Sequence, residues 1–181
     1  MSPYVALLRG INVGGRNPVG MLALAECFRD AGYGNVRTYL QSGNVLFDDA
    51  PKDIGELEAA LDGLLSERFG TSIPTVVRSR EELAATVASA PDDHGSEELR
   101  SEVFFLKQPL TVEAAMQEVP KLREGVDSIA PGLDVLYFSR VATQARRTRI
   151  TRFMSLPVFQ QMTVRSWRTT TRLLELLDAP T

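Results

Sequence analysis

Apolar and polar positions along the first 80 residues alternate between the two-residue period of a strand and the longer period of a helix. Short apolar runs bounded by glycine, asparagine or proline predict strands, and stripes of leucine, alanine and phenylalanine at three- and four-residue spacing predict helices. In chain order, the pattern predicts a strand at residues 3–9, a helix at 21–31, strands at 36–40 and 44–47, a helix at 53–69 and a strand at 73–77.

This order of elements is that of the ferredoxin-like, or split βαβ, fold. We therefore expect an α+β protein whose amino-terminal subdomain is a four-stranded antiparallel sheet with both helices on one face. Asp53 and Glu56 form a capping pair at the start of the second helix. Leu61 lies on the apolar stripe of that helix and is expected to be buried.

The pattern changes after residue 79. It predicts a helix at 80–90, an exposed polar loop at 91–100, a strand at 103–107, a short helix at 111–118, a strand at 135–138 with a candidate partner at 126–130, and a last helix at 166–177. No internal repeat is evident. We expect residues 1–79 to form the ferredoxin-like subdomain and residues 80–181 to form a second, smaller α+β subdomain packed against it.

The composition is typical of an intracellular globular protein. A chain of 181 residues is long enough for an ordinary hydrophobic core, and its single cysteine, Cys27, cannot pair within the chain. The amino terminus lacks the basic segment of a secretory leader, and no apolar run reaches the roughly 18 residues of a spanning helix. We therefore expect a cytoplasmic protein with no membrane partner, and the sequence leaves its oligomeric state open.

Charge is distributed unevenly, although the formal net charge is only −3. No acidic residue lies between Asp134 and Glu175, whereas this segment contains the arginines Arg140, Arg146, Arg147, Arg149, Arg152, Arg165, Arg168 and Arg172. Such asymmetry indicates either a polyanionic or phosphorylated partner, nucleic acid included, or simply a solvated surface.

Three segments of the chain are similar to those of a known family. They are YVALLRGINVGGRNPVGM at residues 4–21, VRTYLQSGNVLF at 36–47 and TVRSWRTTTRLLEL at 163–176. They resemble the domain-of-unknown-function 1697 family, widespread in bacteria, which implies a ferredoxin-like amino-terminal subdomain followed by a second α+β subdomain. The resemblance implies no activity and transfers no catalytic residue. In the third segment, Ser166-Trp167-Arg168 stands where an Asn-Trp-Asn-like run is expected in the family.

A glycine-rich loop between the first strand and the first helix is the first candidate binding site. Its candidate ligand-binding residues are Arg9, Gly10, Asn12, Gly14, Gly15 and Arg16. Glycines allow backbone amides to approach an anion, and the following helix adds partial positive charge. The spacing fits no nucleotide-binding fingerprint, and a purely structural turn needs these glycines too.

The turn at Gln41-Ser42-Gly43-Asn44 is the second candidate, but ordinary hairpin chemistry explains it without a ligand. We expect it to lie at the opposite end of the sheet from the glycine-rich loop, so that the two do not form one pocket.

The third candidate is the arginine-rich carboxyl-terminal segment. Arg165, Arg168 and Arg172 have the spacing of one helix face, and arginine forks bind phosphate groups well. Trp167 or Tyr137 could supply a stacking plane, although the leucines beside Trp167 favour a place in the core.

Few other residues suggest chemistry. His94 is the only histidine and lies among acidic residues, so we expect a solvated loop there, no metal site and no cofactor. Because Ser-His and Cys-His catalysis would both need this one histidine, ordinary nucleophilic catalysis is not expected. The catalytic residues, if there are any, are unknown.

Two functions therefore compete. The leading hypothesis is a non-catalytic binding module for a phosphate-bearing ligand, either nucleic acid or a nucleotide-like molecule. The alternative is an enzyme for a small phosphorylated or acyl substrate, with Arg9 or Arg16 orienting it and a carboxylate acting as the base. A third class, an interaction protein, needs an exposed apolar patch that a sequence cannot locate.

Overall fold

The structure is a computed structural model that describes residues 1–180. Its chain divides into two compact units, Met1–Leu83 with Leu173–Thr181, and Ala84–Arg172. The expected boundary at residue 79 lies near the first division. The residues from Leu173 onward group with the first unit, a connection that spacing along the sequence does not reveal.

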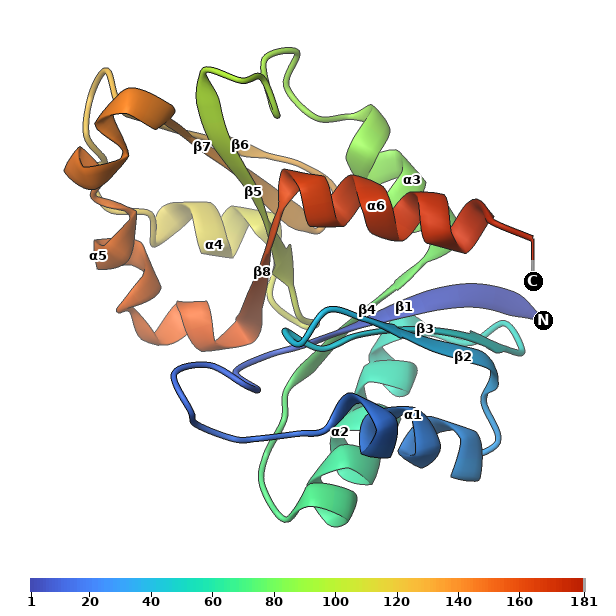
Figure 1. Cartoon of the computed structure of the whole chain (residues 1–181). Coiled ribbons are helices and arrows are strands. Elements are labelled where there is room, and N and C mark those ends of the chain that lie inside the picture. The colour runs from blue at the N-terminus through green and yellow to red at the C-terminus, as the bar shows by residue number, and fades with distance from the viewer. Residues whose placement is uncertain (181) are drawn as a thin grey trace. The chain divides into compact units, whose positions relative to one another are not determined.

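The first unit confirms the βαββαβ arrangement. Its elements are β1 (Ser2–Leu8), α1 (Met21–Asp30), β2 (Gly34–Tyr39), β3 (Asn44–Asp49), α2 (Ile54–Phe69) and β4 (Thr75–Ser79). The sheet has the order β2-β3-β1-β4, and every neighbouring pair is antiparallel. Helices α1 and α2 lie on the same face of this sheet (Figure 1).

Helix α2 shows why these residues form the expected element. The Asp53 side chain accepts a hydrogen bond from the backbone N–H of Glu56, and Gly70 ends the helix with a φ of 68°. Between these ends, Leu57, Leu61 and Leu65 are fully buried against the sheet and α1. The expected burial of Leu61 is therefore confirmed.

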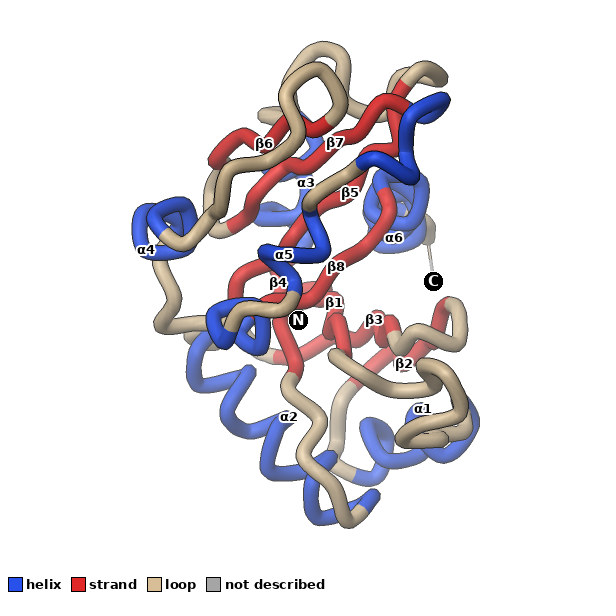
Figure 2. Tube along the Cα trace, turned by 90° about the vertical axis from the view of Figure 1, so that its left-hand side faces the viewer, coloured by secondary structure: helices blue, strands red, loops and turns tan. Residues whose placement is uncertain are grey.

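The second unit contains a second four-stranded antiparallel sheet. Its elements are β5 (Leu99–Leu106), α4 (Val112–Gln117), β6 (Asp127–Pro131), β7 (Val135–Val141), η1 (Ala142–Arg147), α5 (Ile150–Met154), η2 (Pro157–Gln161) and β8 (Met162–Ser166). The strand order is β6-β7-β5-β8, and Figure 2 shows the four strands in this sequence. Counted from its own first strand, this is the same order as in the first unit. The chain thus contains an internal structural repeat, although its two halves have no evident sequence repeat.

The repeat extends to the junction where each fourth strand meets a helix. Arg78 and Arg165 are both buried, and the guanidinium of each donates to the carbonyl of the preceding residue, at 2.6 and 2.9 Å. In each unit the next residue is a serine whose hydroxyl oxygen accepts the backbone N–H three residues ahead. These junctions begin α3 (Arg80–Ala88) and α6 (Trp167–Asp178). The tripeptide Val-Arg-Ser occurs at both junctions, at residues 77–79 and 164–166.

The last helix begins one residue later than expected, and this changes the third candidate site. Arg165 belongs to strand β8 and is only 7% exposed, whereas Arg168 and Arg172 lie on α6 and are exposed. The prediction that the three arginines share one helix face is therefore wrong. No helix within residues 1–180 combines the length and the apolar character needed to cross a bilayer.

Candidate anion-binding site

Strands β5 and β7 bring two arginines together at one end of the second sheet. Arg100 and Arg140 are directly opposite each other in the antiparallel register, and Glu102 follows on the same face of β5. Arg168 comes from the first turn of α6, which continues directly from β8. Since β8 pairs with β5, these elements place all four side chains around one cavity.

The cavity has a volume of about 390 Å³. It is lined by Gly95, Leu99, Arg100, Ser101, Glu102, Arg140, Ser166, Trp167 and Arg168. Three guanidinium groups against one carboxylate leave an excess of two positive charges. We call this space the arginine cavity.

Glu102 only partly offsets the positive charge. Its carboxylate lies 3.6 Å from the Arg140 guanidinium, which is an ion pair without a hydrogen bond. Burial raises the pKa of Glu102 above its usual value, although Arg140 acts in the opposite direction. The Nε atom of Arg140 is buried and has no hydrogen-bond partner, so one donor of this guanidinium is unused.

Trp167 forms an aromatic wall of the arginine cavity and is half-buried rather than enclosed in the core. Its ring contacts the His94 ring edge-on, with centroids 4.7 Å apart. It also covers Gly95 so closely that a Cβ atom there would overlap the indole. Packing from two sides therefore fixes the orientation of an aromatic surface beside the arginines.

Arg165 makes hydrogen bonds within strand β8 and does not line the arginine cavity. Its guanidinium donates to the Thr163 hydroxyl and to the Val164 carbonyl, both at 2.9 Å. Burial lowers the pKa of Arg165 to about 10. These contacts give Arg165 a structural position at the end of β8.

The glycine-rich loop is closed by its own hydrogen bonds. The Asn12 backbone has a φ of 54°. Its side chain accepts a hydrogen bond from the Val19 N–H and donates one to the Val19 carbonyl. The Asn17 side chain donates to the Gly10 carbonyl. Asn12 therefore holds the loop in this shape. Arg9 is half-buried, with its pKa lowered by burial, whereas the candidate residues Gly10, Gly14, Gly15 and Arg16 are exposed.

The expected separation of the two amino-terminal loops is wrong. The Asn12 side chain donates to the Gln41 carbonyl at 2.8 Å, and the Leu8 N–H donates to the Gly43 carbonyl at 2.9 Å. The reason is topological: β1 and β2 are both antiparallel to β3, so they run in the same direction and end at the same edge of the sheet. The Gln41–Asn44 turn thus supports the glycine-rich loop.

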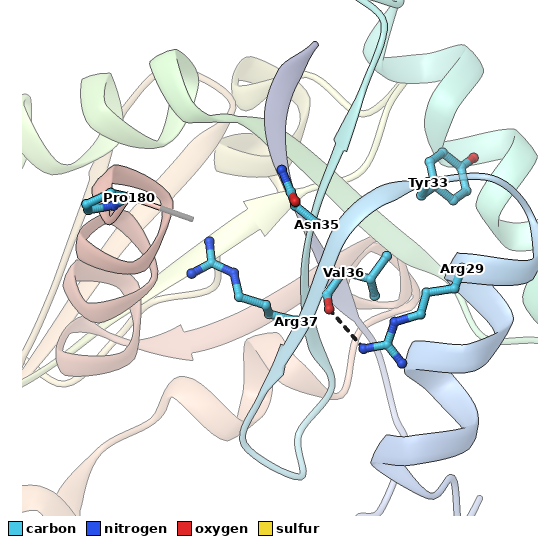
Figure 3. Close-up of a pocket in the computed structure, with 6 residues that line it drawn as sticks. All are labelled: Arg29, Tyr33, Asn35, Val36, Arg37 and Pro180. Atoms are coloured by element: carbon cyan, nitrogen blue, oxygen red, sulfur yellow. Dashed lines mark hydrogen bonds between the residues drawn. The ribbon is translucent and has the colours of Figure 1, made fainter.

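A larger cavity of about 560 Å³ lies at the edge strand β2 of the first unit (Figure 3). Its two arginines are engaged with backbone carbonyls: Arg29 donates to Val36 at 3.2 Å, and Arg37 donates to Leu176 at 2.9 Å. Figure 3 shows the two guanidinium groups on different sides of the strand. The two guanidinium groups therefore do not converge on one point.

His94 was expected in a solvated loop, and this expectation is wrong. Its side chain is only 9% exposed, and its Nδ1 atom lies 3.1 Å from the Ser139 hydroxyl oxygen. Burial lowers its pKa, with Asp93 opposing this shift. Within residues 1–180, no group of three or more histidine, cysteine, aspartate or glutamate residues is arranged to hold a metal ion.

Sequence reasoning found Arg168 and suggested Trp167, but it did not assign Arg100, Glu102 or Arg140 to a site. Arg140 and Arg168 both belong to the acid-free segment, which was a usable signal. Arg100 lies far from them along the chain, and only the pairing of β5 with β7 brings it to the cavity.

Comparison with known proteins gives a family and a fold. A sequence model of the family described as "Protein of unknown function (DUF1697)" matches residues 1–137. The chain is also similar to the solved structure of the conserved bacterial protein SP0830 from Streptococcus pneumoniae, with a TM-score of 0.86 and 22% identity over 97% of this chain and 98% of that chain. That likeness concerns the fold alone. No curated protein matches the sequence.

Proposed function

Since the chain belongs to the DUF1697 family, which is described only as having unknown function, we propose a function from its own geometry. The protein binds a phosphate-bearing ligand in the arginine cavity. The observation that carries this proposal is the convergence of Arg100, Arg140 and Arg168 on one cavity that contains a single carboxylate.

The chemistry of these side chains favours phosphate. An arginine fork donates two parallel hydrogen bonds to a phosphate or carboxylate group, and it keeps its charge when partly desolvated. Arg140 has an unused Nε donor, and the exposed Arg100 and Arg168 side chains can turn toward a ligand. A bound dianion would neutralise the excess positive charge.

Size and the aromatic wall favour a nucleotide-like ligand over a nucleic acid. A volume of about 390 Å³ is within the roughly 300–1,000 Å³ typical of small-molecule sites. Trp167 offers a fixed ring beside the arginines, and stacking of a base on an aromatic side chain contributes about 1–3 kcal/mol. The proposed ligand therefore carries both a phosphate group and a planar ring.

Titration with pyrophosphate, ATP and a short oligonucleotide tests this proposal. Trp167 is the only tryptophan of the chain, so its fluorescence reports directly on the cavity. We expect ATP to change this fluorescence, and we expect Arg140→Ala combined with Arg168→Ala to weaken binding at least about 100-fold, since a hydrogen bond to a charged group contributes about 1.5–3 kcal/mol. The exposed Arg152, on α5 and outside the lining, provides the matched control Arg152→Ala.

Calorimetry at low and high salt separates the outcomes. A nucleic acid would show log K falling by about 0.9 per neutralised phosphate against log salt, whereas a small nucleotide would show a shallow dependence. Arg9→Ala is included because the glycine-rich loop is the competing anion site. Equal binding by wild type and the double arginine variant, or a loss confined to Arg9→Ala, would reject the arginine cavity.

Anion binding should also strengthen as the pH falls through the raised pKa of Glu102. Above that pKa the carboxylate is charged and competes for Arg140, and below it the carboxyl is neutral and the net positive charge of the cavity increases. Sulfate is a suitable probe because its own charge is constant over this range. Glu102→Gln should bind sulfate more tightly than wild type at neutral pH and lose most of the pH dependence. An unchanged pH profile in this variant would contradict the assigned role of Glu102.

A further inference from the structure

Three serines lie side by side across the second sheet. Ser101, Ser139 and Ser128 occupy neighbouring positions in the register of β5, β7 and β6. His94, from the loop after α3, joins this row through Ser139. Two buried hydroxyl groups and one buried imidazole thus form a connected polar group inside the second unit.

The hydrogen bonds of this group can run in one direction, from the Gly95 N–H through Ser101 and Ser139 to His94. The backbone N–H of Gly95 can only donate, and it donates to the Ser101 hydroxyl oxygen at 2.8 Å. In the arrangement that uses every hydroxyl hydrogen, Ser101 donates to Ser139 at 2.8 Å, and Ser139 donates to Nδ1 of His94 at 3.1 Å. The His94 ring then carries its proton on Nε2, a buried atom without a hydrogen-bond partner.

Aromatic packing holds the imidazole in its orientation, a role that a carboxylate has in Ser-His-Asp triads. Trp167 and Tyr137 both contact the His94 ring edge-on, with centroid distances of 4.7 and 5.4 Å. Tyr137 is itself held, because its hydroxyl donates to the Thr86 carbonyl at 2.6 Å. Burial keeps the pKa of His94 below its ordinary value, so the ring is neutral at neutral pH and able to accept a proton.

The pair opens onto a small cavity of about 150 Å³, distinct from the arginine cavity. Its lining consists of Pro91, Asp93, His94, Ser128, Ile129, Ala130, Tyr137 and Ser139. At about 30 Å³ per water molecule, the space is sufficient for a group of a few heavy atoms. A short acyl chain fits this volume, and the Ser128 hydroxyl, which donates to the Ser139 carbonyl at 3.5 Å, lines the same cavity.

We propose that Ser139 and His94 act as nucleophile and general base in the transfer of a small acyl group. The Ser139 oxygen forms a bond to the acyl carbon while its proton passes to Nδ1 of His94. The leaving group departs with its bonding electrons and takes that proton. Water then attacks the acyl carbon and loses a proton to Nδ1. The bond between the acyl carbon and the Ser139 oxygen breaks, the proton on Nδ1 passes to the Ser139 oxygen, and the carboxylic acid is released. This activity is independent of the ligand proposed for the arginine cavity.

The test uses p-nitrophenyl acetate on the full chain, with nitrophenolate release and intact mass as readouts. We expect a burst of one nitrophenolate per chain and, after a rapid acid quench, one acetyl group located on Ser139 by peptide mapping, with no such label in Ser139→Ala. His94→Gln should slow acetylation about 100-fold or more. The matched control is Ser96→Ala, since Ser96 is an exposed hydroxyl in the same loop as His94. The acetylation rate should fall as His94 becomes protonated, at a pH below the ordinary histidine pKa, which a purely structural histidine would not cause.

Ser139→Cys keeps the proposal testable where Ser139→Ala disturbs folding. The thiol retains a nucleophile at the same position, so this variant should form a thioester and regain the acetyl mass. Absence of the label in wild type would overturn the proposal. So would a label on other residues, or equal rates in wild type and His94→Gln. None of these results bears on nucleotide binding, which has its own fluorescence readout.

Discussion

Replacing Glu58 by alanine is expected to lower the free energy of unfolding by about 3–5 kcal/mol, the usual cost of breaking a buried ion pair from one side. Glu58 is 1% exposed on α2, and its carboxylate lies 3.6 Å from the guanidinium of Arg78, which is 3% exposed. The same carboxylate oxygen accepts the backbone N–H of Val77 at 3.0 Å. The alanine variant therefore removes a charge partner and a hydrogen-bond acceptor from a site that water does not reach.

The position of this carboxylate beside an edge strand explains why its hydrogen bond to the strand matters. β4 is at the edge of the first sheet, so alternate backbone N–H groups along it have no strand to bind. Helix α2 supplies the acceptors: Glu58 binds the N–H of Val77, and Asp62, one turn later, binds the N–H of Thr75 at 2.9 Å. Carboxylates four residues apart on a helix thus match N–H groups two residues apart on a strand.

Glu58→Gln separates the two contributions, because the amide oxygen can still accept the Val77 N–H while the charge is lost. Urea denaturation should place Glu58→Gln between wild type and Glu58→Ala. A loss below about 1 kcal/mol for Glu58→Ala would show that neither the ion pair nor the edge contact stabilises the unit.

Local patterns in the sequence were sufficient for the first unit. The turn residues between β2 and β3, the leucine stripe of α2 and the caps at Asp53 and Gly70 all act over a few residues, and each agrees with the fold. The two-residue alternation expected in these strands is wrong, because residues 44–47 are all buried and Leu40 is exposed. The error about the two loops has a different origin. It came from the relative direction of β1 and β2, which the crossover through α1 makes parallel, so that both strands end at the same end of the sheet.

The second unit was harder because its decisive contacts join distant segments. Its second helical crossover is divided among η1, α5 and η2, so the helix period that would reveal a repeat is broken. The acidic neighbours of His94 correctly indicate a loop. The burial of the His94 side chain, however, depends on Ser139 and Trp167, and Ser139, the nearer of the two, lies 45 residues further along the chain. Arg100 reaches the arginine cavity only through the register of β5 with β7.

Gly95→Ala is expected to impair both stability and ligand binding. Gly95 has a φ of 84°, so alanine there incurs the strain of the left-handed region, about 1–2 kcal/mol. Its Cβ atom would also overlap the Trp167 ring, and overpacking of this kind typically costs about 1–3 kcal/mol more. The indole has to move to relieve the overlap, and since it forms a wall of the arginine cavity, nucleotide affinity should fall about ten-fold or more.

Gly125→Ala is the matched control, because Gly125 has a similar φ of 74° in the same unit but open space where a Cβ atom would be. It should show the backbone strain alone, with unchanged ATP titration of the Trp167 fluorescence. Thermal unfolding and that titration, measured on both variants, therefore isolate the effect of the indole. Equal ATP affinity in Gly95→Ala and Gly125→Ala would mean that the ligand does not need the fixed position of Trp167. That result would contradict stacking of the ligand on Trp167, but it would not contradict phosphate binding by the arginines.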